Sequence, residues 1–299
     1  MSALVLILIL LLLFGGGGGY YALGPAGGIG IGGIILIVLI VLLLFAAFSA
    51  RAHEYTDVYY DTAEPGWGAF LVQSDTFEFI AFFIYGSDGK PTWYTAQLTD
   101  DGTGTDTFTG TLYAITGTYF INPWTGYVIN PAGTATFAAI DNYHATLKYT
   151  VNGLPMVTKA VQRQTLTPYK MAGDYSGSMA GSISGCAGPQ ADPMFRARYG
   201  LAVTQVADAS ATLVFTFVDT THSGIVCTAT GPLTHLGRLY QMAGGTVACT
   251  GPGQDGKPRA ATIDSLHPTG QGIEGKITGD AGGGCTESLH FSAVFNVNN

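Results

Sequence analysis

The sequence predicts an all-β protein: two small antiparallel β-barrel or β-sandwich domains of about eight strands each, behind a hydrophobic segment. Short runs of β-branched and aromatic residues alternate with Gly-, Asp- and Pro-rich turns through residues 53–299, which is typical of antiparallel meanders. No convincing amphipathic helical period interrupts these runs. Residues 53–167 and 168–299 are each long enough to bury a core of their own, so we expect two β-domains.

The hydrophobic segment covers residues 1–52, and its first fifty residues contain no charged side chain. Two apolar blocks, ALVLILILLLLF (3–14) and IILIVLIVLLLFAAF (34–48), flank a Gly-rich middle. Each block alone is shorter than the ~20 residues that cross a bilayer as a helix. Extended into the flanking glycines and tyrosines, both become long enough, with Gly24-Pro25 as the turn of a helical hairpin. This interpretation predicts a membrane anchor with a lipid partner for residues 1–50.

A secretion signal is the competing interpretation of the same segment. Ala50-Arg51-Ala52 is an A-x-A-like site that directly follows an apolar run, and His53 would then begin the mature chain. No Lys or Arg precedes the apolar run, which is unusual for a signal. Residues 1–50 also resemble short, uncharacterised bacterial membrane proteins built of two aliphatic runs around a Gly/Tyr/Pro-rich middle. That resemblance implies a membrane location and no activity, so anchor and signal both stay open.

Residues 53–167 contain eight runs of strand character. Asp88-Gly89 and Asn152-Gly153 are turn signals of tight hairpins. Polar and apolar residues alternate with a period of two in the run 144–151, as in a strand with one buried face. The expected strands are 55–60, 68–74, 77–86, 92–99, 106–115, 134–140, 144–151 and 156–165.

Four stretches of this domain carry a family resemblance. They are YTDVYYDTAEPGWGAFL (55–71), IYGSDGKPTWY (84–94), FTGTLYAITGTYF (108–120) and ATLKYTVNGLPMVTKAVQRQTL (145–166). Together they resemble an uncharacterised β-rich module of secreted proteobacterial proteins. That family often has Trp where this chain has Tyr59-Tyr60, so aromatic character is kept at these positions without implying one particular contact. The resemblance implies export from the cytoplasm and supplies no activity.

Pro168 marks the change to the second domain, 168–299, which also contains about eight runs of strand character. All four cysteines lie here, no CxxC pair occurs, and no His has metal-type spacing to a Cys. Two disulfides in an oxidising compartment are therefore expected, with no metal site and no cofactor. Three pairings are possible. Cys227–Cys249 within one hairpin and Cys186–Cys285 between the first and last strands is the preferred one. The expected strands are 174–186, 199–206, 210–219, 224–235, 238–250, 260–269, 272–280 and 288–297.

The charge pattern bears on partners. The formal net charge is −8, and Lys and Arg form no cluster anywhere. A nucleic-acid backbone needs such a cluster, so we expect no nucleic-acid partner. With the disulfides and the exported-module resemblance, the expected location is the bacterial cell envelope. The β-domains would be periplasmic behind an inner-membrane anchor, or fully exported.

The stretch YYDTAEPGWGAF (59–70) supplies the first candidate site residues. Trp67 stands between two glycines after a Pro-Gly corner, which is typical of an aromatic plug at the end of a small barrel. In a functional interpretation Trp67, Trp93, Tyr94 and Trp124 line a mouth and stack on a glycan or another flat small molecule.

Carboxylates supply the second set of candidates. Glu64 and Asp61 could act as a catalytic pair on a glycosidic bond if they lay about 5–9 Å apart. The turn DDGTGTD (100–106) could hold Ca²⁺, but it lacks the twelve-residue loop with a closing Glu, so a solvated turn is expected.

Three functional classes remain open. The leading expectation is a non-enzymatic envelope protein that binds a ligand or an envelope component through its β-domains. The alternatives are a polysaccharide-acting hydrolase that uses Glu64 and Asp61, and a structural surface protein that binds no small molecule.

Overall fold

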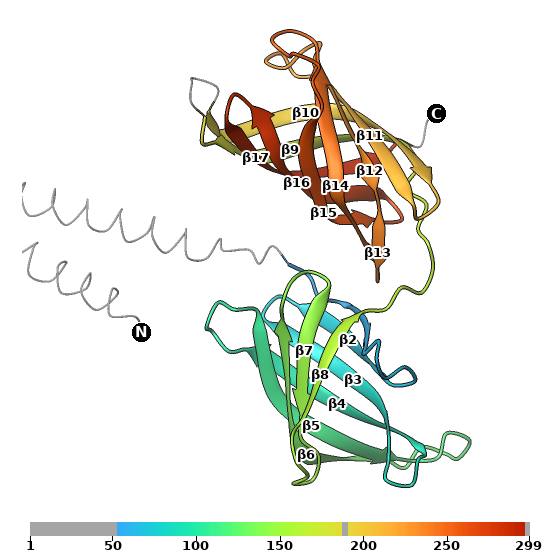
Figure 1. The fold of residues 1–299 in the computed structure, drawn as a ribbon. Coiled ribbons are helices and arrows are strands. Elements are labelled where there is room, and N and C mark those ends of the chain that lie inside the picture. Colours follow the sequence, from blue (N-terminus) through green and yellow to red (C-terminus); the bar gives the residue numbers. More distant parts are fainter. Residues whose placement is uncertain (1–52, 187–190, 297–299) are drawn as a thin grey trace, which may run out of the picture. The chain divides into compact units, whose positions relative to one another are not determined.

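The computed structural model describes residues 53–186 and 191–296, and every named element in these ranges is a β-strand (Figure 1). The all-β prediction is confirmed. The expected hydrophobic hairpin or signal, 1–52, lies outside the described residues. Within the described part of the chain, no helix is long and apolar enough to span a bilayer.

Eight strands form a closed antiparallel barrel, in which each strand pairs with its neighbour in sequence and β1 pairs with β8. One face of each strand is buried inside it. In β3, for example, Ile80 and Phe82 point inward and Phe79 and Phe83 outward, because side chains alternate across a strand. The strands are β1 (Asp57–Tyr60), β2 (Gly68–Ser74), β3 (Phe77–Tyr85), β4 (Pro91–Asp100), β5 (Thr107–Gly117), β6 (Tyr127–Ala139), β7 (His144–Tyr149) and β8 (Val157–Arg163).

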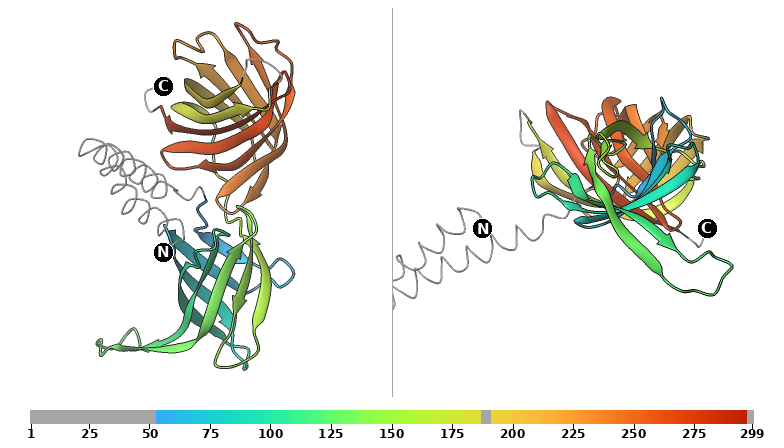
Figure 2. Two further views of the ribbon diagram at one scale, coloured as in Figure 1. Left: turned by 90° about the vertical axis from the view of Figure 1, so that its left-hand side faces the viewer. Right: turned by 90° about the horizontal axis from the view of Figure 1, so that it is seen from below.

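Strand β6 is much longer than the run 134–140 that the sequence predicts. Its first half contains Pro131, which lowers strand propensity because it has no N–H for a ladder bond. The structure accommodates Pro131 at a register shift, where Leu112 pairs with Gly133 and Tyr113 pairs with Pro131. A Cβ atom on Gly133 would overlap the Thr150 carbonyl group, so glycine is required at this irregularity. As a result the β5–β6 hairpin reaches well beyond the other turns of the barrel (Figure 2, green).

The second sheet has nine strands in the order β12-β11-β10-β9-β17-β16-β15-β14-β13. Because β12 also pairs with β14, the sheet closes into a ring of eight strands, and the short β13 lies beside β14. We call this ring the second barrel. Its strands are β9 (Gly173–Ser184), β10 (Asp192–Val206), β11 (Ser210–Phe217), β12 (Val226–Pro232), β13 (Thr234–Leu236), β14 (Leu239–Thr250), β15 (Arg259–Pro268), β16 (Gly272–Gly282) and β17 (Cys285–Phe295).

Strand β10 begins at Asp192, well before the predicted start at residue 199. The stretch before residue 199 does alternate, since Phe195, Ala197 and Tyr199 are buried while Arg196 and Arg198 are exposed. The two outward arginines give this stretch the composition of a polar connection, which is why the predicted strand begins too late.

The first strands of the two barrels are anchored in the same way. The Tyr59 hydroxyl donates to the Tyr55 carbonyl oxygen at 2.9 Å, and the Tyr175 hydroxyl donates to the Met171 carbonyl oxygen at 2.8 Å. Both tyrosine side chains are buried. Each barrel therefore fixes the chain that enters its first strand with a buried hydroxyl, which satisfies a polar group that burial would otherwise leave unpaired.

Candidate functional site

A cavity of about 500 Å³ opens at one end of the second barrel. All eight strands of the ring contribute to its lining, so it lies in the mouth of the barrel. Its apolar part is formed by inward-facing residues. Phe195, Phe217 and Leu289 are each buried. We call this space the mouth cavity.

Both disulfides lie in the wall of the mouth cavity. Cys227 and Cys249 pair directly across β12 and β14 and are bonded. Cys186 follows β9 and is bonded to Cys285, the first residue of β17. The preferred pairing is confirmed, although β13 separates Cys227 from Cys249, so these two do not share a simple hairpin. Each bond joins two neighbouring strands at the end of the barrel that holds the mouth cavity.

The charged groups of the mouth cavity are four carboxylates and one guanidinium: Asp192, Asp255, Asp280, Glu287 and Arg259. Arg259 is committed to Asp255, with 2.7 Å between Nη2 and Oδ2. A Cβ atom on Gly282 would lie only 2.7 Å from Nη2 of that guanidinium. Glycine at this position therefore provides the space that the Arg259 side chain occupies.

Glu287 faces into the barrel, because it occupies the same inward phase of β17 as the buried residues Cys285, Leu289 and Phe291. Burial raises the pKa of the Glu287 carboxyl, the Arg259 charge lowers it, and the Asp280 charge raises it again, with a net upward shift. A carboxylate in this position favours either protonation or a cation brought in by a ligand.

His222 covers one side of the same cavity. Its ring centroid lies 5.0 Å from that of Phe195 and 5.7 Å from that of Phe217. Its Nδ1 is 2.8 Å from Asp219 Oδ1. Burial would raise the pKa of Asp219, but hydrogen bonds from the Arg198 amide and from the His222 ring and amide lower it to about 2. The aspartate therefore fixes the orientation of the imidazole over the apolar part of the cavity.

Trp67 lies at the end of the first barrel and packs against its core, as an end plug does. Its Nε1 is buried and has no hydrogen-bond acceptor among the described residues. Lys159 Nζ lies 5.8 Å from the ring centroid and donates to Glu64 Oε2 at 2.5 Å. This hydrogen bond raises the pKa of Lys159. Asp61 Oδ1 accepts from the Ala63 amide at 2.9 Å. Glu64 and Asp61 are thus engaged in an ion pair and a turn, and neither lines the mouth cavity.

The remaining aromatic candidates lie on different surfaces. Trp93 points outward from β4 and borders a cleft of about 170 Å³ with Phe83 and Tyr85. Tyr94, the next residue, is partly buried against the core on the opposite face. Trp124 is exposed in the β5–β6 turn, with its ring 6.2 Å from that of Tyr127. The structure therefore does not bring Trp93, Tyr94 and Trp124 to one face of the barrel.

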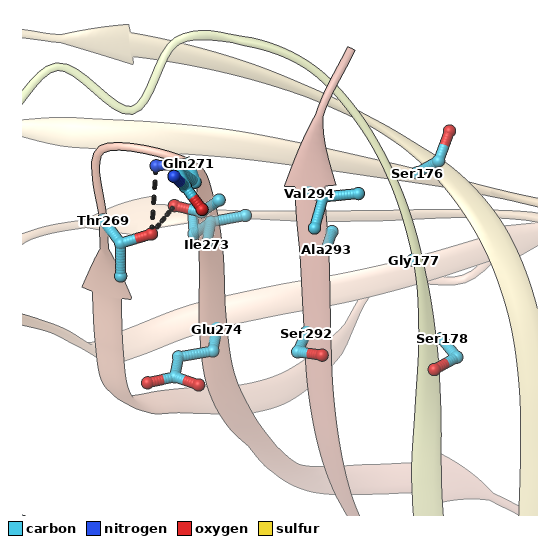
Figure 3. Close-up of a pocket in the computed structure, with 11 residues that line it drawn as sticks. Ser176, Gly177, Ser178, Thr269, Gln271, Ile273, Glu274, Ser292, Ala293 and Val294 are labelled. Atoms are coloured by element: carbon cyan, nitrogen blue, oxygen red, sulfur yellow. Dashed lines mark hydrogen bonds between the residues drawn. The ribbon is translucent and has the colours of Figure 1, made fainter.

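A groove of about 420 Å³ runs over the outer face of the second barrel across β9, β16 and β17 (Figure 3). Its side chains are mostly short, including Ser176, Ser178 and Ser292. Glu274 is its charged residue, and its Oε1 lies 3.3 Å from His267 Nδ1. Short hydroxyls on an open face offer little area for a ligand, so the mouth cavity is the better site.

In the described residues, no group of three His, Cys, Asp or Glu side chains is placed to hold a metal ion. The turn 100–106 is organised by its own carboxylates: Asp100 and Asp101 accept hydrogen bonds from the amides of Gly102 and Thr103. No protein-family model matches the chain, and a search of curated proteins finds no match either.

Sequence reasoning placed the candidate site in the first barrel and missed the mouth cavity. A signal for it exists in CTESLHFSAVF (285–295), where Glu287 occupies the apolar phase of an alternating strand. A carboxylate at such a position is rarely buried without a reason. Arg259 on β15 and Phe195 on β10 are each two strands away from β17 in the sheet, so no local pattern in the sequence could place them beside Glu287.

Proposed function

We propose that this protein is a non-enzymatic binding protein of the bacterial cell envelope, and that its second barrel holds a small, largely apolar cation. The observation that carries the proposal is Glu287, an inward carboxylate beside the apolar part of the mouth cavity. The volume of about 500 Å³ falls in the range of pockets that hold small molecules, roughly 300–1,000 Å³.

The charge of the mouth cavity favours a cation. Arg259 forms its ion pair with Asp255, and its charge only partly offsets the burial and the Asp280 charge that raise the pKa of Glu287. An ammonium group near Glu287 would form a charge-assisted hydrogen bond, worth about 1.5–3 kcal/mol. The faces of Phe195 and Phe217 are suited to the apolar part of the ligand and attract a cation through their π systems.

An envelope location is supported by the two disulfides and by the charge-free segment 1–50. Disulfides persist in oxidising compartments. A barrel with fixed strands at its mouth also suits binding, because a preformed cavity costs little ordering entropy when the ligand enters.

The test uses three ligands that share one alkyl chain and differ in head-group charge: octylammonium, octanol and octanoate. Isothermal titration calorimetry on the oxidised protein at pH 7 should show octylammonium binding about tenfold or more tighter than octanol, with octanoate weakest. Glu287→Gln should remove the difference between octylammonium and octanol.

Two further variants complete the design. Phe217→Ala should weaken octylammonium and octanol alike, because it removes apolar contact and not charge. Glu274→Gln, a carboxylate on the outer groove of the same barrel, is the matched control and should change nothing. Equal affinity of the three ligands, or an equal effect of both Glu→Gln variants, would contradict the proposal.

A further inference from the structure

The outer surface of β2, β3 and β4 is aromatic rather than polar. Phe83 and Tyr85 are 58% and 56% exposed, and Trp93, which pairs with Phe83 across β3 and β4, is 49% exposed. Phe70, Val72 and Phe79 continue the exposed patch over β2 and β3, where Val72 pairs with Phe79. We call these six residues the aromatic wall. Contiguous exposed apolar surface of this kind marks an interaction site.

Charged groups are absent from the outward positions of this part of the barrel. Within β2 and β3 the sole charged residue is Glu78, and its side chain is fully buried inside the barrel. The turn at the end of the wall contains Asp88 and Lys90, which pair with each other at 3.4 Å. The wall therefore presents an apolar surface without a net charge.

The β5–β6 hairpin adds a second exposed apolar region. Residues 107–140 include no Asp, Glu, Lys, Arg or His. At the tip of the hairpin Phe120 is 85% exposed and Trp124 is 70% exposed, and Tyr119, Ile121 and Tyr127 are exposed beside them. Figure 2 shows this hairpin (green) projecting from the barrel. We call these five residues the aromatic tip.

The wall and the hairpin that carries the tip lie next to each other around the barrel, because β4 neighbours β5. The chain enters at β1, the wall occupies β2 to β4, and the tip follows at β5 and β6. Since neighbouring strands run antiparallel, the chain enters at one rim and the hairpin turns at the other rim. Strands of this length separate the two rims by roughly 20–25 Å. Two arcs of the ring connect β1 with β6, one through β2 to β5 and one through β8 and β7. The second arc carries the exposed Lys148 on β7, so a planar apolar partner that reaches both rims is expected along the wall.

We infer that the first barrel lies side-on against a lipid bilayer and contacts it through the aromatic wall and the aromatic tip. The partner is the bilayer for two reasons. Residues 1–50, which the sequence predicts to enter a membrane, join the chain directly before β1. Trp and Tyr, which favour the boundary between head groups and acyl chains, occur at the tip together with the deeper-seeking Phe120 and Ile121.

This contact is distinct from ligand binding in the mouth cavity, which belongs to the other barrel. It also predicts an unusual dependence on lipid charge. The protein has a net charge of −8 and the contact surface offers no Lys or Arg to anionic head groups, apart from the paired Lys90. Apolar insertion should therefore drive the contact, and added anionic lipid should not strengthen it.

The test exploits the tryptophans, because Trp67, Trp93 and Trp124 are the three in the chain. The full chain is reconstituted into phosphatidylcholine vesicles as three double Trp→Phe variants, each of which keeps one tryptophan. Emission is then measured with lipids brominated on their acyl chains and with aqueous acrylamide. Trp124 should shift to shorter wavelength and be quenched at least twofold by the brominated lipid, and Trp93 should be quenched to a smaller extent. Trp67, which packs against the barrel core, is the internal control and should respond little to either agent.

Each other outcome would overturn the inference. Quenching of Trp124 by acrylamide and not by lipid means that the tip stays in water. Protection of Trp124 from both agents means that protein covers it, either a second copy or another part of the chain. A Phe120→Ser, Ile121→Ser variant provides an independent check, since it alters exposed residues that the barrel core does not need. It should return Trp124 emission to its aqueous wavelength, and an unchanged lipid quench would also reject the contact.

Discussion

Arg163 Nη1 lies 3.0 Å from Asp57 Oδ2, and both side chains are almost completely buried, at 1% and 4% exposure. The pair joins β1 to β8, where the barrel closes through a short ladder of two residue pairs. Arg163 also donates from Nε to the Asn142 carbonyl oxygen at 2.7 Å. Asp57 Oδ2 accepts from the Arg238 amide at 2.9 Å. A buried ion pair is retained only when such extra hydrogen bonds satisfy its remaining groups.

Arg163→Met should therefore be destabilising, by about 3 kcal/mol, because it leaves the buried Asp57 charge with only the more distant Arg238 guanidinium, whose Nε lies 3.9 Å from Oδ2. Urea unfolding followed by tryptophan fluorescence reports the first barrel, which contains all three tryptophans. Adding Asp57→Asn to Arg163→Met should recover part of the loss, since the amide oxygen still accepts from the Arg238 amide without carrying a charge. A double variant less stable than Arg163→Met alone would show that the charge of Asp57 is not the source of the cost.

A pair of glycine substitutions tests the packing of the strands. A Cβ atom on Gly110 in β5 would overlap the Gln97 carbonyl oxygen of β4, whereas a Cβ atom on Gly200 in β10 meets nothing within 4 Å. Gly110→Ala should cost about 1–3 kcal/mol or more through overpacking. Gly200→Ala, the matched control, should be neutral or slightly stabilising because alanine loses less backbone entropy on folding. Equal effects on the urea midpoint would contradict the close approach of β4 to β5 at Gly110.

The difference between these glycines illustrates what sequence could and could not supply. Alternation in runs such as 144–151 predicted the strands and the all-β class, because the period of two depends on residues close in the chain. The Asp-Gly and Asn-Gly turns indicated several hairpins for the same reason. Register and close approach between strands do not leave such a local mark. Nothing near Gly110 in sequence indicates that Gln97 approaches it, and nothing near Glu287 indicates that Arg259 lies in the same mouth.

In β6, by contrast, a local signal was present and gave the wrong start of the strand. Pro131 is a sound local reason to begin the strand later, yet the register shift opposite Leu112 and Tyr113 places the proline where the ladder tolerates it. Tertiary pairing outweighs local propensity there. The projecting hairpin that carries the aromatic tip is therefore not predicted from sequence, although its charge-free composition is visible.

The contact between Asp219 and His222 predicts an acid-sensitive second barrel. The pKa of Asp219 is lowered to about 2 in the folded protein, against 3.8 as its ordinary value, and its side chain is 17% exposed. A lowered folded-state pKa means that the stabilisation is present above about pH 4 and is lost as the pH falls towards 2. With allowance for solvent screening it amounts to about 1–2 kcal/mol. Urea unfolding by circular dichroism should show Asp219→Asn less stable than the natural chain at pH 5 and equal to it near pH 2. A gap that persists unchanged at pH 2 would exclude this ionisation as its cause.

Ionisation of Glu287 should change the stability of the second barrel in the opposite direction to ionisation of Asp219. The folded-state pKa of Glu287 is raised, with burial as the largest cause, so the ionised carboxylate at pH 7 destabilises the ligand-free barrel. The cost is removed when the pH falls through the raised pKa, because the folded state then gains a proton more readily than the unfolded chain. Glu287→Gln keeps the shape of the side chain without its charge. Calorimetry of the ligand-free protein at pH 7 should show the variant melting about 2–4 °C higher, a difference that shrinks at pH 4.

The same substitution links stability to binding. If Glu287 is retained to meet a cation, octylammonium should raise the melting temperature of the natural protein and raise that of Glu287→Gln much less, because ligand binding to the folded state alone stabilises it. The order of stability would then reverse between the ligand-free and ligand-saturated proteins. Such a reversal is expected when a charged residue costs folding energy and is held in place by the ligand that it binds. A variant that stays the more stable one at saturating octylammonium would instead assign Glu287 to the fold of the mouth, with no part in holding a cation.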